Sequence, residues 1–429
     1  MSRLLHRSGL LSAKAHIFAV VAVTFLSLLV SAGVRATPGV LLLPLQLQFG
    51  WDRATISLGA AIGIFLYGLV GPFAAALMQS FGIRRTMLGG LGLMALATFA
   101  SLWMRTPLEY ILSWGVFSGI GTGAVASVLG AAVVNRWFAT RQGLVMGLLS
   151  ASTATGALVF LPFLAWLSAQ YTWRPVVLTV SLACMILVPL VALVLPEHPG
   201  DIGTQRFGEI DGTAPAKPAR RRTVGLAFSV LAMAAKRPVF WLLFGTFFVC
   251  GLTTNGLIGT HMIAFCGDHG VAPVAAAGLL SMMGVFDLIG TTASGWLTDR
   301  HDSRALLIVY YGLRGLSLMA LPFLSFDTLN LTIFAVFYGL DWIATVPPTA
   351  KLCNQAFGEQ DAPIVFGWVL AGHQLGAATA AFGAGLIRQQ TGTYTPAFVA
   401  AGAMGVVAAL VLLASLRALS LIHISEPTR

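Results

Sequence analysis

The sequence predicts an all-α polytopic membrane protein whose twelve transmembrane helices form two pseudo-symmetric bundles of six. Hydrophobic residues make up 57% of the 429-residue chain and charged residues only 9%, whereas a soluble protein exposes far more charge. The mean hydropathy is +0.86. Apolar runs of about 20 residues, long enough to cross a bilayer, alternate with short loops along the chain. A charged turn also recurs in the two halves, which indicates an internal repeat.

The predicted spans form two sets of six with a polar segment between them. The first apolar run begins near Ile17 and is long enough to span, so we expect a helix rather than a cleaved signal. The spans are 17–46, 55–79, 86–105, 109–134, 143–168, 173–195, 238–265, 273–297, 305–325, 329–350, 363–387 and 395–418. We therefore expect a basic cytoplasmic leader (1–16), an N-terminal bundle (17–195), a cytoplasmic linker (196–237), a C-terminal bundle (238–418) and a tail (419–429).

The linker and the tail differ in composition from the bundles. The linker 196–237 is polar, rich in Pro and Gly, and contains the basic run 220–222, so it cannot bury a core and is expected to lie against anionic lipid. The last ten residues, 420–429, resemble translated sequencing-adapter sequence. We expect this tail to be non-native and assign no function to His423 or Glu426.

Positive charge predicts the orientation of the chain. Of the 25 Lys and Arg residues, 19 lie in the leader, the linker, the tail, the last helix end and the loops that share their side of the bilayer, and only four lie in the alternate loops. Because cytoplasmic segments carry the excess of Lys and Arg, both termini and the linker are predicted to be cytoplasmic. The net charge of +10 has the same origin and does not indicate a nucleic-acid partner.

The turn between the eighth and ninth predicted spans carries a recognisable motif. Residues 295–304 read Gly-Trp-Leu-Thr-Asp-Arg-His-Asp-Ser-Arg, and the spacing G-x-L-x-D-R-x-x-x-R resembles the loop signature of the major facilitator superfamily of transporters. In that family the acid, here Asp299, caps and pairs across a helix end. The arginines, here Arg300 and Arg304, latch the two helices to their neighbours. The resemblance implies the major facilitator fold.

A weaker copy of the motif lies 220 residues earlier, at 75–84, followed by Arg85. Leu77 and Arg84 match the later copy, while Gln79 and Ser80 replace the acid and the base, so this latch is expected to be electrostatically weaker. By resemblance, the two copies form a cytoplasmic gate that contains Gly82, Arg84, Arg85, Gly295, Asp299, Arg300 and Arg304.

Further stretches resemble one branch of that superfamily. The segment 135–143 and the sequence Gly50-Trp51-Asp52-Arg53 are similar to the monocarboxylate-transporter and oxalate–formate-exchanger branch. The segments 339–348 and 372–376 resemble a bacterial group within it. The resemblance covers the chain up to about residue 418.

Five ionisable residues inside predicted spans are the candidate functional residues. Each costs about 2.5–3.5 kcal/mol on insertion scales and therefore requires a partner or a function. By the resemblance, the first, seventh and tenth spans line the central cavity, which makes Arg35, His261 and Asp341 the candidate substrate-binding residues. The others are Asp287 and Arg314, and His373 is a sixth candidate.

Different functions are expected for these side chains. The guanidinium of Arg35 matches a carboxylate bidentately, and its alternative is a structural pair with an acid on a neighbouring helix. Asp341 and His261 are candidates for carrying a proton; the alternatives are a fixed salt bridge of Asp341 to Arg314 and a merely hydrogen-bonded His261. Asp287 and Arg314 are expected to neutralise each other between adjacent spans.

The sequence departs from the branch it resembles on the eighth predicted span. Monocarboxylate transporters carry an Asp and, one turn later, an Arg on the eighth span, but Thr291 stands four residues after Asp287. Their substrate-binding arginine is thus missing, and Arg35 is a hypothetical replacement from the other half.

These features favour a secondary active transporter of a small organic anion, a mono- or dicarboxylate, by proton symport or anion exchange. The alternative is proton-coupled efflux of drugs or other amphipathic compounds. A third hypothesis, a membrane-bound sensor or enzyme, lacks a nucleophile–base constellation. We expect no cofactor and no metal, since the four cysteines show no metal-ligand spacing. The protein is expected to be a monomer in the bacterial inner membrane.

Overall fold

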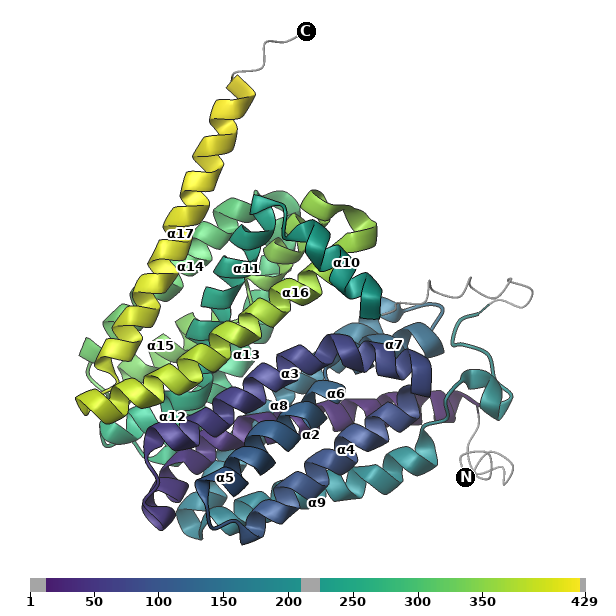
Figure 1. Cartoon of the computed structure of the whole chain (residues 1–429), viewed down its shortest axis with the longest axis horizontal. Coiled ribbons are helices and arrows are strands. Elements are labelled where there is room, and N and C mark those ends of the chain that lie inside the picture. Colours follow the sequence, from purple (N-terminus) through teal and green to yellow (C-terminus); the bar gives the residue numbers. More distant parts are fainter. Residues whose placement is uncertain (1–12, 210–223, 425–429) are drawn as a thin grey trace. The chain divides into compact units, whose positions relative to one another are not determined.

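The computed structural model describes residues 13–209 and 224–424, and these residues are almost entirely helical (Figure 1). The first helices are α2 (Ala13–Phe49), α3 (Arg53–Phe81), α4 (Ile83–Ala100), η1 (Ser101–Trp103), α5 (Pro107–Tyr110), η2 (Ile111–Phe117), α6 (Ser118–Ala124), α7 (Ser127–Trp137), α8 (Gln142–Gln170), α9 (Trp173–Val194) and η3 (Pro199–Ile202). Then follow α10 (Val224–Ala234), α11 (Pro238–Gly251), η4 (Leu252–Ile258), α12 (Gly259–Asp268), α13 (Pro273–Arg300), α14 (Ser303–Ala320), η5 (Leu321–Phe323), α15 (Thr328–Asp341), α16 (Val346–Thr391) and α17 (Thr395–Ile424).

Helix boundaries follow local sequence signals. Thr106 and Glu109 form a capping box at the start of α5, and Asp302 caps α14 by accepting from the backbone N–H groups of Arg304 and Ala305. Gly392 has a φ of 75° and ends α16, because a glycine adopts the left-handed conformation without strain. Helix α16 also contains a break at Gly358, where φ is 75°.

The chain divides into two compact units. Unit 1 comprises Met1–Trp51 and Leu58–Ala227, and unit 2 comprises Asp52–Ser57 and Phe228–Arg429. The first turn of α3 therefore belongs to unit 2, although the rest of that helix belongs to unit 1. Within unit 1, α2 packs against α8 and α4 against α9. Within unit 2, α14 packs against α17, α11 against α16, and α13 against α15.

Ten helices in the described residues are long and apolar enough to cross a membrane. The prediction of an all-α protein with several membrane-spanning helices is thus confirmed. The two remaining expected spans coincide with the segment α5–α7 and with α8. The segment α5–α7 is interrupted, since η2 is a π-helix and Ala126 has extended backbone between α6 and α7. In α8, the apolar helix found is the short stretch Phe160–Gln170.

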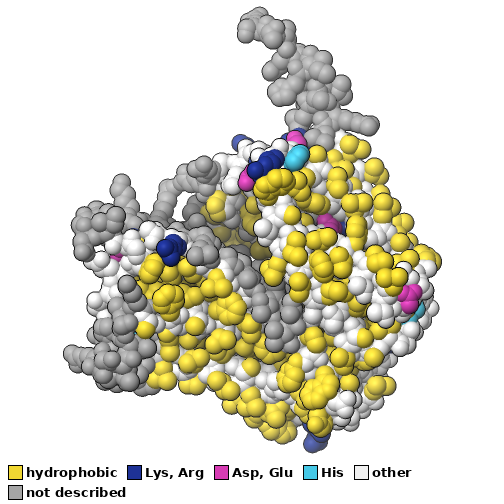
Figure 2. All heavy atoms as spheres, turned by 180° about the vertical axis from the view of Figure 1, so that it is seen from behind, with side chains coloured by type: hydrophobic (Ala, Val, Ile, Leu, Met, Phe, Trp, Pro, Cys, Tyr) yellow, Lys and Arg dark blue, Asp and Glu magenta, His cyan; other side chains and the backbone are white. Residues whose placement is uncertain are grey.

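The surface matches a membrane environment. Hydrophobic side chains cover most of the face shown in Figure 2, and charged side chains gather at a few places on it. Large apolar side chains such as Leu96, Trp103 and Ile186 are more than half exposed. A lipid solvent explains this exposure, which an aqueous protein rarely tolerates.

Close backbone contact holds the helices of unit 2 together. A Cβ at Gly290 of α13 would overlap the carbonyl oxygen of Leu340 of α15, and one at Gly339 of α15 would lie 2.7 Å from the carbonyl oxygen of Met283. The two glycines thus allow the backbones of α13 and α15 to approach each other closely. Such approach drives association where lipid removes the hydrophobic drive between helices.

Gly290→Ala is expected to destabilise the protein by at least about 1–3 kcal/mol, because the methyl group must displace a backbone carbonyl. Gly278→Ala, in the same helix with no atom within 4 Å of the new Cβ, is the matched control. It is expected to be neutral or to gain up to about 1 kcal/mol from helix propensity. Thermal unfolding in detergent measures both, and equal midpoints would contradict the packing argument.

Candidate functional site

A buried ion pair lies in unit 2 between α14 and α15. Arg314 is fully buried, and its Nε donates to Oδ2 of Asp341 at 2.6 Å. Its Nη2 donates to the backbone carbonyls of Asp341 and Trp342. One carboxylate and two carbonyls thus satisfy one edge of the guanidinium, as a buried charge requires.

The other side of Arg314 contacts α11. Its Nη1 donates to Sγ of Cys250 at 3.0 Å, and Sγ lies 3.2 Å from Oγ1 of Thr345. The ring of Tyr311 lies 5.8 Å from the guanidinium carbon. Because all three guanidinium nitrogens donate hydrogen bonds, Arg314 is held in one position.

Asp287 on α13 does not form the ion pair that the sequence led us to expect. Its Oδ1 accepts from Oγ1 of Thr291 and from the backbone N–H of Ile343, each at 2.9 Å. The prediction that Asp287 and Arg314 neutralise each other directly is therefore wrong, and the alternative pair with Asp341 is the one formed. Thr291, which replaces an arginine of the similar branch, donates its hydroxyl to the neighbouring acid.

His261 on α12 is buried away from this ion pair. Its Nδ1 lies 3.1 Å from the hydroxyl oxygen of Tyr394, and its Nε2 lies 2.7 Å from the carbonyl oxygen of Ala381. Both ring nitrogens are thus engaged in unit 2. The structure does not bring His261 into contact with Asp341 or Arg314.

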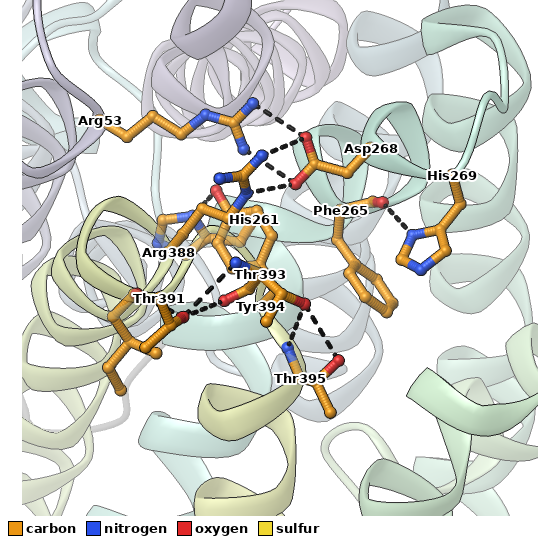
Figure 3. Close-up of polar contacts among 11 residues, drawn as sticks. Arg53, His261, Phe265, Asp268, His269, Arg388, Thr391, Thr393, Tyr394 and Thr395 are labelled. Carbon is orange, nitrogen blue, oxygen red and sulfur yellow. Dashed lines mark hydrogen bonds and ion pairs between the residues drawn. The ribbon is translucent and has the colours of Figure 1, made fainter.

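A second charged cluster of unit 2 centres on Asp268 at the end of α12 (Figure 3). Both nitrogens of the Arg53 guanidinium fork donate to it, at 3.1 and 2.9 Å. Arg388 of α16 donates through Nε at 2.6 Å and through Nη2 at 3.3 Å. The ring of Tyr394 lies 5.6 Å from the Arg53 guanidinium and 6.0 Å from that of Arg388.

Sequence reasoning missed this Asp268 cluster. The sequence identifies Arg53 only as part of the branch-like sequence 50–53 and as a loop charge, and Arg388 only as a loop charge; Asp268 is not singled out. The available signal was an acid at the end of an apolar run, in a set of loops that carries only four basic residues.

In unit 1, Arg35 of α2 has a different environment. Its guanidinium carbon lies 4.5 Å from the centre of the Tyr67 ring on α3, a cation–π contact, and the residue is half-buried. Among the residues that the structure describes, no carboxylate forms an ion pair with it. The alternative of a structural pair with an acid on a neighbouring helix is therefore not found there.

The first motif copy is completed by an acid from elsewhere in the chain. Glu197, after α9, accepts from the backbone N–H groups of Ile83 and Arg84 at 2.6 and 3.1 Å, and it pairs with Arg136. It thus caps the N-terminus of α4, where the helix dipole favours negative charge. A Cβ at Gly82 would lie 2.5 Å from the Glu197 carboxyl, which explains the glycine. The guanidinium of Arg84 donates to the carbonyl of Ala192.

The second motif copy differs from the family pattern. Asp302, rather than Asp299, caps the following helix, with Oδ1 2.7 Å from the N–H of Arg304. Asp299 is exposed, and within the described part of the chain its side chain forms no hydrogen bond or ion pair. Arg300 lies over the Trp296 ring at 4.1 Å. The expectation that the acid at 299 caps the helix end is therefore wrong.

Glu197→Gln is expected to lower the free energy of unfolding by about 1.5–3 kcal/mol, because charged hydrogen bonds to the α4 terminus and to Arg136 are lost. Glu209→Gln is the control, since Glu209 pairs with Arg206 on the surface, where hydrogen bonds from Arg206 lower the pKa of Glu209. Chemical denaturation of both variants in detergent tests this difference. A loss for Glu197→Gln no larger than for the control would refute the capping role.

Comparison with known proteins provides the family context. The family model of the Major Facilitator Superfamily matches residues 23–362 of this chain. Monocarboxylate transporter 13 of Rattus norvegicus is 29% identical over 377 residues, which cover 86% of this chain and 82% of that protein. The uncharacterized MFS-type transporter YcxA of Bacillus subtilis is 26% identical over 364 residues, covering 82% of this chain and 84% of YcxA.

A solved structure has the same fold. The crystal structure of a D-xylose–proton symporter superposes with a TM-score of 0.70 at 13% identity, covering 92% of this chain and 97% of the symporter. At this identity the likeness concerns the fold alone.

Proposed function

The chain belongs to the major facilitator superfamily and is a multi-pass membrane transporter rather than an enzyme, and we propose that it moves a small organic anion, a mono- or dicarboxylate, by alternating access. Coupling by proton symport or by anion exchange is part of the proposal. The names of the monocarboxylate-transporter relatives support this substrate class.

The environment of Arg35 is the observation that carries the proposal. A guanidinium within a transmembrane span is costly unless an anion compensates it. Arg35 contacts the face of the Tyr67 ring and has no ion pair with the described residues. A substrate carboxylate would supply the missing charge and match the guanidinium fork bidentately.

The proposed topology keeps twelve spans, with α5–α7 and α8 as the two beyond the ten apolar helices. The distribution of Lys and Arg supports cytoplasmic termini. A monomer in the bacterial inner membrane completes the proposal. Efflux of amphipathic cations is disfavoured, because the first span carries the base Arg35 and lacks the buried acid that is expected there for many cation exporters.

Arg35→Gln is expected to reduce anion uptake at least tenfold, because one charged hydrogen-bonded pair contributes about 1.5–3 kcal/mol. Arg35→Lys should retain part of the activity, since it keeps the charge but loses the fork. Arg174→Gln is the matched control, because Arg174 also lies over an aromatic ring, that of Trp173.

The measurement is uptake of labelled lactate, oxalate, succinate and aromatic acids into proteoliposomes, with lipophilic cations as the competing class. Uptake of every accepted anion by Arg35→Gln at the wild-type rate would refute the proposed role. Transport of cations alone, independent of Arg35, would instead favour the efflux function.

The two motif copies are proposed to stabilise the state that is closed on the cytoplasmic side. Asp299→Asn is expected to leave stability unchanged, since the carboxylate has no hydrogen bond or ion pair with the described residues, but to favour opening of that side. Asp302→Ala should instead cost about 0.5–2 kcal/mol of stability through loss of the α14 cap.

Maleimide labelling of a cysteine introduced at the buried Thr349 reports opening, measured as the excess over the same protein without that cysteine, because the four native cysteines are buried as well. Labelling should be faster with Asp299→Asn than without it. Equal labelling rates would count against a gating role for Asp299.

A further inference from the structure

We infer that Arg388 forms a second anion site, separate from Arg35, which binds the carboxylate of the substrate at the predicted non-cytoplasmic face before transport. The inference rests on the proposed function, because it takes the substrate class from there. It goes beyond that function by assigning an entry site to the Asp268 cluster of unit 2. The ligand of this site is a small mono- or dicarboxylate.

The hydrogen bonds of Arg388 leave one edge of its guanidinium free. A guanidinium has five N–H donors, and each of two edges can match a carboxylate. Nε and Nη2 of Arg388 donate to the two oxygens of Asp268, at 2.6 and 3.3 Å. Nη1 donates no hydrogen bond within the described part of the chain. The edge formed by Nη1 and the second N–H of Nη2 can therefore bind another carboxylate.

The carboxylate of Asp268 is shared between two arginines (Figure 3). Arg53 donates to both of its oxygens, at 3.1 and 2.9 Å, so each oxygen accepts two hydrogen bonds. Two positive charges and one negative charge leave the three side chains with a charge of +1. The side chains of Arg53 and Arg388 are only 10% and 24% exposed, so water screens this charge in part. An anion bound at Arg388 would make the cluster neutral.

Neighbouring side chains do not supply the missing negative charge. His261 and Tyr394 hydrogen-bond to each other, at 3.1 Å between Nδ1 and the phenol oxygen, and both are neutral groups in that bond. Two further acids of unit 2 on the same predicted face, Asp52 and Asp327, accept from backbone N–H groups at the starts of α3 and α15. Asp268 is thus the acid that compensates this pair of arginines.

The position of the free edge suits capture of the substrate rather than its transport. Arg388 lies near the end of α16 and Asp268 ends α12, next to loops that carry few basic residues. A partly exposed ion pair changes affinity by only about two- to fivefold, so a bound anion leaves readily. Two parallel N–H donors match the two oxygens of a carboxylate better than a spherical chloride. Such a site raises the local concentration of carboxylates and hence their rate of entry.

The charge count predicts opposite effects for two substitutions. Arg388→Gln removes the free edge and leaves Asp268 with Arg53, a neutral pair, so carboxylate binding should weaken about two- to fivefold. Asp268→Asn leaves both arginines uncompensated, so binding should strengthen by a similar factor. If Arg388 only held Asp268 in place, both substitutions would break the same contact and change binding in the same direction.

Binding at this site is measured in the Arg35→Gln background, which lacks the proposed transport site. Saturation-transfer NMR of lactate with the purified protein in detergent, at constant ionic strength, gives the affinity. Arg35→Gln should still bind lactate weakly, Arg388→Gln added to it should lower the affinity, and Asp268→Asn should raise it. Arg174→Gln, another arginine of the same predicted face that lies over the Trp173 ring, is the control and should leave the affinity unchanged.

Transport kinetics provide a second readout in otherwise wild-type protein. In right-side-out membrane vesicles, Arg388→Gln should raise the KM for lactate added outside about two- to fivefold and leave kcat unchanged. The KM for efflux from loaded vesicles should not change, because the site serves only entry from one face. A fall in kcat with an unchanged KM would indicate a role in transport itself and would overturn the entry site.

The outcomes separate this inference from the proposed function. Unchanged lactate affinity in Arg388→Gln, a loss in Asp268→Asn as well, or an equal loss in Arg174→Gln would overturn the entry site. Displacement of lactate by an equal concentration of chloride would also overturn it, since the site would then hold any small anion. Transport by Arg35→Gln at the wild-type rate would refute the proposed function instead, and lactate binding that depends on Arg388 would still support the entry site. If Asp268→Asn does not fold, Arg388→Gln and its control decide alone, because Arg388→Gln keeps the Arg53–Asp268 pair.

Discussion

The burial of Arg314 is the constraint on which the arrangement of unit 2 depends. A fully buried guanidinium must be compensated in charge and in hydrogen bonds. Asp341 provides the charge, two backbone carbonyls and Cys250 provide the remaining acceptors, and these groups come from α11, α15 and the turn that follows α15. The rotation of α11, α14 and α15 is therefore coupled to the position of one side chain.

The same physical solution recurs elsewhere in each unit. Glu197 joins the start of α4 to Arg136 in unit 1, and Asp268 joins Arg53 to Arg388 in unit 2. In each case a single carboxylate, which accepts several hydrogen bonds, connects segments far apart in the sequence. In unit 1 the acid also replaces the one that the first motif copy lacks, so the electrostatic weakness expected from the sequence is compensated by tertiary structure.

The two units differ in the electrostatic character of their buried and half-buried charged residues. In unit 1, the basic Arg35 lies against an aromatic face without an ion pair among the described side chains. In unit 2, the Asp287–Arg314–Asp341 cluster contains one more acid than base.

The sequence by itself determined the all-helical membrane class, the family and the set of costly intramembrane charges. These follow from hydropathy, from loop motifs and from residue identity, which are local properties of the chain. Only the tertiary structure decided which charges meet: Arg314 with Asp341 rather than with Asp287, Glu197 with the start of α4, and Asp268 with two arginines. The physical reason is that partner choice depends on how each helix is rotated about its axis. In lipid, hydropathy constrains that rotation little, whereas close glycine contacts such as Gly290 against Leu340 determine it.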